Sequence, residues 1–163
     1  MAATFTPIAS ITLGASTSTI VFSSIPQTYT DLIIVTNLVS AAGNQDLDLR
    51  FNGDTGTNYS WTALYGTGSA AASTRGTSDN KFRADQYGYI ETTLRQNAIV
   101  QIQNYSNTTT FKTAISRANN ASTGVDINVG LWRSTAAISS ITFVNNLASG
   151  STFNLYGILG ANA

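Results

Sequence analysis

The residues best suited to chemistry in this sequence are oxygen-bearing side chains in one short stretch. Asp46, Asp48 and Asp54 lie there with Asn52 and Asn58. Carboxylate and amide oxygens are the ligands that Ca²⁺ prefers, but the spacing differs from that of an EF-hand loop, which needs a bidentate Glu. We favour a second interpretation, in which Asp46 and Asp48 form the solvent face of a strand and the following residues form a turn. Asp46, Asp48 and Asp54 remain the candidate metal ligands under the first interpretation, and no cofactor is expected.

A second group of acids could carry out glycoside hydrolysis. Asp79, Asp85 and Glu91 lie near a Gly- and Ser-rich stretch. That chemistry needs two carboxyl groups at a defined separation, and nothing in this spacing fixes one. The sequence has no His and no Cys, which excludes the Ser–His–Asp triad, thiol nucleophiles and the commonest zinc ligands. We expect that the protein is not an enzyme.

Aromatic side chains form the third group. Trp61 and Tyr65 share one face of an expected strand with Tyr59, because side chains alternate along a strand. Aromatic rings bury the C–H faces of sugars, so a glycan site is one interpretation. A sandwich core or a subunit interface, where Tyr and Trp are also enriched, is the interpretation that we favour. The interface or glycan candidates are Tyr59, Trp61, Tyr65, Arg75, Tyr87 and Tyr89.

The composition excludes several classes of partner. Only 10% of the 163 residues are charged, and eight Lys and Arg balance eight Asp and Glu. No basic cluster follows a phosphate backbone, so we expect no nucleic acid as a partner. The longest apolar run, LIIV at 32–35, is too short for a membrane span of about 20 residues. The first ten residues lack the pattern of a secretory signal, and we expect a protein made in a host cytoplasm, with no membrane partner.

Two features of the charges favour an assembly. A net charge of zero protects a free monomer poorly from association. Six of the eight basic residues are Arg, whose planar guanidinium binds carboxylates in a bidentate way and is suited to interfaces.

The elements that must position these residues are strands. Alternation of apolar and polar residues is clearest in QDLDLRFNGD, where Leu47, Leu49 and Phe51 point one way. No window of twelve residues has helical periodicity. The pattern predicts an all-β fold: an antiparallel, jelly-roll-like β-sandwich of about eight to ten strands. Other expected strands are 17–22, 29–38, 58–65, 87–94, 138–146 and 152–159, with the alternating runs AIVQIQNY, FKTAISRA and VDINVGLW.

Turns and loops divide these strands. Asn52-Gly53 is a hairpin signal, and SNTTT at 106–110 is expected to be a hairpin loop. The run at 32–35 has no polar alternation, which predicts a strand that is covered on both faces. We expect residues 1–15 to form an N-terminal arm and 16–163 a single sandwich domain. The Gly- and Ser-rich residues 66–80 are expected to be a long surface loop, and this loop and the arm are candidates for contacts with neighbours.

Three stretches carry a resemblance to a known group of proteins: FSSIPQTYTDLIIV, LRFNGDTGTNYSWTALYG and ISSITFVNNLASGSTFNLYGI. Over about residues 17–159 the chain resembles small jelly-roll structural proteins in the virions of tailed bacteriophages. Members of this group are capsid decoration (cement) proteins or modules of head and tail fibres. Fibre modules often follow a collagen-like or coiled-coil stalk, and we find no such tract here, which favours decoration.

The resemblance implies a function and partners. It implies a virion structural protein on the capsid surface, a homotrimer that binds and stabilises the shell of the major capsid protein. The alternative that it implies is a receptor- or glycan-binding module of a tail or head fibre.

Overall fold

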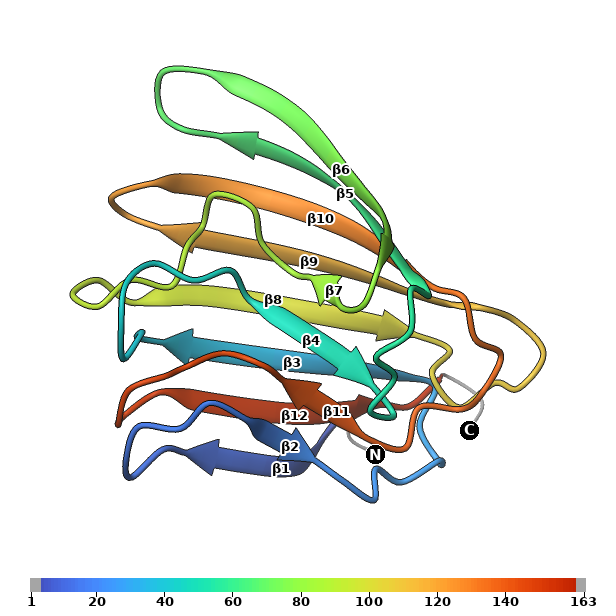
Figure 1. The fold of residues 1–163 in the computed structure, drawn as a ribbon. Coiled ribbons are helices and arrows are strands. Elements are labelled where there is room, and N and C mark those ends of the chain that lie inside the picture. Colours follow the sequence, from blue (N-terminus) through green and yellow to red (C-terminus); the bar gives the residue numbers. More distant parts are fainter. Residues whose placement is uncertain (1–3, 161–163) are drawn as a thin grey trace.

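The computed structural model describes residues 4–160, which form a sandwich of two antiparallel sheets (Figure 1). The larger sheet has eight strands in the order β1-β12-β3-β8-β9-β10-β5-β6, and the smaller has four in the order β2-β11-β4-β7. Residues 4–160 contain no helix that could cross a membrane. The expected all-β sandwich is confirmed. The strands number twelve rather than eight to ten, because three of them are only two or three residues long.

The small sheet lies in front of the large sheet from its β1 edge to about β9, and the β5–β6 hairpin projects beyond it at the other edge (Figure 1). The hairpin's inner side is therefore not covered by the small sheet along its whole length. The strands of the large sheet are β1 (Phe5–Thr12), β3 (Asp31–Leu38), β5 (Tyr59–Gly66), β6 (Ala71–Asp79), β8 (Gln96–Gln103), β9 (Lys112–Asn120), β10 (Gly124–Trp132) and β12 (Thr152–Ile158). The strands of the small sheet are β2 (Ile20–Phe22), β4 (Asp48–Phe51), β7 (Phe82–Arg83) and β11 (Ile141–Phe143).

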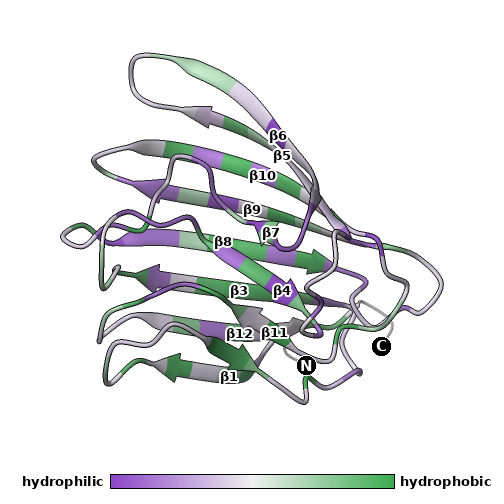
Figure 2. Cartoon of the chain, viewed as in Figure 1, coloured by the Kyte–Doolittle hydropathy of each residue, from purple (hydrophilic) through white to green (hydrophobic). Residues whose placement is uncertain are grey.

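The core lies between the two sheets. Residues of β9 alternate between buried and exposed positions along the whole strand. Figure 2 shows hydropathy alternating along β8, whose apolar residues Val100 and Ile102 are buried. Leu32 and Ile34 of the large sheet and Leu49 and Phe143 of the small sheet are fully buried. Burial of each such side chain contributes about 1.5–3 kcal/mol, so these contacts hold the two sheets together.

The hairpin signals have different outcomes. Residues 106–110 connect the paired strands β8 and β9, so that hairpin is confirmed. Asn52 and Gly53 both adopt positive φ (52° and 68°), as the turn requires. They nevertheless join β4 of the small sheet to β5 of the large sheet, so the turn leads from one layer to the other and closes no hairpin.

Two segments expected to be irregular are edge strands. Residues 5–12, placed by the sequence in an arm, form β1 and pair with β12; residues 1–3 of that arm lie outside the described residues. The stretch 66–80, expected to be a long loop, contains β6, which pairs with β5. Most residues of both strands are at least partly exposed, so neither strand has the apolar alternation that marks a half-buried strand.

Candidate functional site

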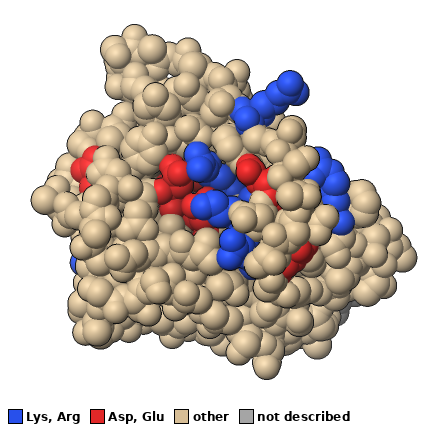
Figure 3. Space-filling model, viewed as in Figure 1, with Lys and Arg blue, Asp and Glu red and all other residues tan. Residues whose placement is uncertain are grey.

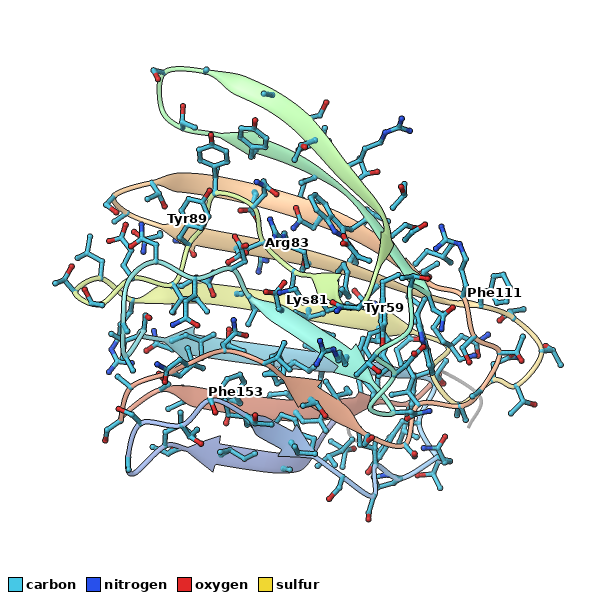
Figure 4. All side chains as sticks on the ribbon, viewed as in Figure 1. Tyr59, Lys81, Arg83, Tyr89, Phe111 and Phe153 are labelled. Carbon is cyan, nitrogen blue, oxygen red and sulfur yellow. The ribbon has the colours of Figure 1, made fainter. Side chains whose placement is uncertain are left out.

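Four of the six interface or glycan candidates converge where the β5–β6 hairpin extends past the small sheet. Tyr65 of β5 stacks on Tyr87, with ring centroids 4.3 Å apart and planes 17° apart. The ring centroid of Tyr89 lies 5.7 Å from that of Tyr87, and Figure 4 shows Tyr89 in front of β9 and β10, next to the hairpin. All three rings are half-buried. We call these three residues the tyrosine stack.

A chain of polar contacts runs beside the tyrosine stack. Trp61 donates a hydrogen bond from Nε1 to Asp79 at 2.6 Å, and the Arg83 guanidinium lies 5.3 Å from the centre of its ring. Arg83 also pairs with Asp46 at 2.8 Å, and Lys81 pairs with Asp48 at 2.6 Å. Acidic and basic side chains gather on this face of the molecule (Figure 3). The site thus combines aromatic rings with paired charges.

Residues 84–91 carry two of the tyrosines and form no strand, although 87–94 was expected to be one. One carboxylate oxygen of Asp126 on β10 accepts hydrogen bonds from the backbone N–H groups of Gln86, Tyr87 and Gly88, at 2.7–2.9 Å. Asn120 and Ser116 of β9 donate to backbone carbonyl groups of the same segment. Side chains of the large sheet therefore replace a strand partner, and this explains why local sequence did not indicate the segment's conformation.

The other two candidates lie elsewhere. Tyr59 is fully buried, and its hydroxyl oxygen accepts a hydrogen bond from the N–H of Phe51 at 3.0 Å. Burial raises the pKa of Tyr59 to about 12, so this side chain is a neutral part of the core. Arg75 is exposed on the opposite face of the large sheet, since it pairs with the outward residue Thr62.

The metal candidates do not come together. Asp54 accepts hydrogen bonds from the side chains of Trp132 (2.7 Å) and Asn58 (2.9 Å) and from the N–H of Gly56 (2.8 Å). Burial would raise the pKa of Asp54, but these hydrogen bonds outweigh it and lower the pKa. Asp46 pairs with Arg83 and Asp48 pairs with Lys81. The expectation that both aspartates form the solvent face of a strand is wrong for Asp48, which is buried with its carboxylate against Lys81. Within residues 4–160 no group of three or more His, Cys, Asp or Glu is arranged to hold a metal.

The three acids considered for glycoside hydrolysis have separate structural partners. Asp79 binds Trp61, and Glu91 accepts a hydrogen bond from Ser122 at 2.5 Å. Asp85 is fully buried, where it accepts hydrogen bonds from the N–H of Leu47 and from the Gln96 amide. They do not form a pair across an open site.

Asp85 leads to a prediction about stability and pH. Burial raises the pKa of its carboxyl group well above the ordinary value of 3.8, and negative charges on Asp46, Asp126 and Asp48 act in the same direction. The folded state then binds more protons than the unfolded state above about pH 4. The stabilisation is complete below the unfolded pKa and is lost as the pH rises through the folded pKa, at about 1.4 kcal/mol per pKa unit.

Chemical denaturation at several pH values tests this prediction. The free energy of unfolding of the native protein should fall as the pH rises above about 4, and Asp85→Asn should make the profile flatter. Asp31→Asn serves as the control, because Asp31 is only half-buried at the start of β3. A profile that is unchanged by Asp85→Asn would contradict the assignment.

The outer face of the large sheet, turned away from the small sheet, is a second candidate surface that sequence reasoning missed. The run at 32–35 was expected to be covered on both faces, but Leu32 and Ile34 are buried while Ile33 and Val35 are only half-buried on the outer face. The apolar patch on this face consists of Leu64 (58% exposed), Ile115 (37%), Val125 (59%), Ile127 (41%) and Val129 (52%).

Strand register makes this patch continuous. Ile33, Gln101, Ile115, Val129 and Thr62 lie side by side across five neighbouring strands. Shallow depressions lie on the same face. One of about 510 Å³ lies between β3 and β10, and others of about 630 Å³ and 410 Å³ lie along β10, β5 and β6. The outer face is therefore open, grooved and mostly uncharged.

Comparisons with known proteins do not assign the chain to a family. No family model matches the sequence, and no curated protein matches it. Among solved structures, a PL-14 alginate lyase from Aplysia kurodai is 8% identical, covering 82% of this chain and 70% of its own, with a TM-score of 0.32. An alginate lyase in complex with an alginate trisaccharide is 11% identical, covering 91% and 80%, also with a TM-score of 0.32. These scores are too low to support an argument about activity.

Proposed function

We propose that the protein is a structural subunit of a bacteriophage virion, a capsid decoration protein that binds the shell of the major capsid protein through the outer face. The observation that carries this proposal is the exposed apolar patch on β5, β9 and β10 of the large sheet, and β3 of the same sheet has the sequence of a strand covered on both sides. Monomeric proteins rarely expose large contiguous apolar patches, and such patches mark interaction sites. The sequence resemblance supplies the virion context.

The proposed mechanism is adhesion. Apolar area buried on the outer face would supply the free energy of binding, and repetition of the subunit over the capsid lattice would multiply it. Contacts between copies in the proposed homotrimer would come from the free edge of β6, which is nine residues long and has no Pro. An unpaired strand edge offers its backbone N–H and C=O groups to another chain. Light scattering that gives the mass of one chain would contradict the trimer.

Two measurements test the adhesive role. Quantitative mass spectrometry of the purified source virion should give a copy number comparable with that of the shell protein. Only a handful of copies per particle would contradict decoration.

The second measurement uses variants of the outer face. Ile127→Asp and Val129→Asp should each reduce binding to undecorated capsids about tenfold or more, because a carboxylate would be buried against apolar surface. Both side chains are exposed in the free chain, so the unfolding temperature should change little. Val21→Asp is the matched control, since Val21 is 46% exposed on the small sheet. Equal binding by the outer-face variants and the control would contradict the proposed interface.

The tyrosine stack favours a second candidate function, glycan or receptor binding by a fibre module. Stacked aromatic rings beside hydrogen-bonding Asp and Arg side chains are the elements of a sugar site, and Tyr65, Tyr87 and Arg83 provide them. This function predicts that the isolated chain binds glycans on an array and that Tyr87→Ala abolishes the signal. A decoration protein predicts no such binding.

A further inference from the structure

Charges are distributed unequally between the two sides of the large sheet. Arg117 of β9 and Arg75 of β6 point outward, as their pairing with Ile127 and Thr62 shows. Arg95 binds the outward residue Asn37 at 2.8 Å, and Arg133 binds the outward Ser60 at 3.1 Å. These four arginines lie within the outer face or at its ends.

The acids are almost absent from this face. Of the eight Asp and Glu residues, only Asp31 occupies an outward position in the large sheet, and it accepts a hydrogen bond from the N–H of Asn104 at 2.7 Å. In the ion pairs found in residues 4–160, the basic partners are Lys81 and Arg83, and no other Lys or Arg of this part of the chain takes part. Arg75 and Arg117 therefore carry positive charge that nothing in the described chain neutralises.

Each of these two arginines borders a depression. Arg117 lines the one of about 510 Å³ together with Ile99, Asn119 and Val125. Arg75 lines the one of about 410 Å³, whose other residues include Val129. Three inter-strand spacings of about 4.8 Å separate β9 from β6, so the backbones at Arg117 and Arg75 lie about 15 Å apart across the sheet. The register also offsets Arg75 by two residues along the strands from the position opposite Arg117. Each depression offers an apolar wall, hydrogen-bonding groups and one cation.

The charges argue against a second copy of the chain as the occupant. Two outer faces stacked on each other would bring arginines together without carboxylates to pair with them, and burial of unpaired charge is costly. An occupant that supplies carboxylates would relieve this cost.

We propose that the outer face binds a protein surface that has an apolar centre and two carboxylate side chains, one entering the depression beside each of Arg75 and Arg117. This inference rests on the proposed function and names the chemistry of the shell-protein surface. Composition favours a protein over an acidic glycan. In the strands that lie between β3 and β6 in the sheet, no outward position carries an aromatic ring or a Lys. The outward aromatic residue Tyr156, on the neighbouring strand β12 beside Ile33, lines neither of the two depressions. Arg together with apolar residues, in the absence of Lys, is typical of the centre of protein interfaces.

The test compares the full chain with a double charge reversal, Arg75→Glu and Arg117→Glu, in two experiments. The first measures cosedimentation with undecorated capsids from the source virion at low and at physiological salt. The second follows amide shifts by NMR during titration with a short oligoglutamate peptide, and with an oligogalacturonate of equal charge. Arg50→Glu is the control variant, because Arg50 lies on β4 of the small sheet and binds the carbonyl of Asn80.

We expect the double variant to bind capsids about tenfold or more weakly than the control. Wild-type binding should weaken with salt, and peptide-induced shifts should be confined to the outer face. If the double variant binds capsids as tightly as the wild-type chain does, this inference is overturned and the adhesive function is left in place. Peptide binding at the outer face without capsid binding would support the inference and contradict the virion role. Tighter binding of the oligogalacturonate than of the peptide would overturn the choice of a protein partner.

Discussion

Asp126→Ala should release residues 86–88 from the large sheet and lower the free energy of unfolding by about 3–5 kcal/mol. Asp126 is 6% exposed, and its carboxylate is the shared acceptor for three consecutive backbone N–H groups. A buried N–H that loses its acceptor costs about 1–3 kcal/mol. Because three backbone N–H groups in one segment lose their acceptor together, a small local shift cannot give all of them new partners.

Hydrogen exchange and thermal unfolding measure this effect. Amide protection of Gln86, Tyr87 and Gly88 should fall much more than that of β9, and the near-ultraviolet circular dichroism of the tyrosine stack should weaken. Asp126→Asn keeps one carbonyl oxygen and should cost less. Asp31→Ala removes a carboxylate that accepts a single N–H and is the control. Unchanged protection of the three amides in Asp126→Ala would show that the segment is held by other contacts.

This dependence on Asp126 explains why the site could be predicted only in part. Periodicity indicated that segments such as β9 and β10 are strands, because alternation is a local property of the sequence. The segment that carries Tyr87 and Tyr89 owes its conformation to side chains about 30–40 residues away along the chain. No local pattern encodes such contacts. The proximity of these two tyrosines to Tyr65 could therefore be recognised only in the structure.

The outer face shows the opposite case. Here the sequence predicts that a strand is covered on both sides, but the isolated chain covers only one of them. The apolar run of β3 predicts coverage on two sides, and the small sheet supplies only one. On β10 the alternation is reversed, because its outward positions carry Val125, Ile127 and Val129 while its buried positions include Asp126 and Asn128. Periodicity indicated strands here correctly, but it contained no information on which side the chain itself would cover. The edge strand β6 had neither signal, because its small polar residues are exposed on both faces.

Gly130→Val is the substitution expected to separate the two sheets. Gly130 lies on the inner side of β10, opposite the buried ring of Phe82 on β7. A Cβ atom at position 130 would come within 3.0 Å of that ring, a separation that real Cβ atoms essentially never show. The absence of a side chain here is what lets β7 approach the large sheet.

Overpacking of this kind costs about 1–3 kcal/mol, which corresponds to a fall in unfolding temperature of about 2–12 °C for a chain of this size. Gly14→Ala is the control, since nothing lies within 4 Å of the added atom. If the clash with Phe82 is the cause, the cost of Gly130→Val should shrink in a Phe82→Leu background, because substitutions in contact are not additive. Strictly additive costs would instead mean that Gly130 is needed for the backbone of β10 itself, and that other contacts set the distance between the sheets.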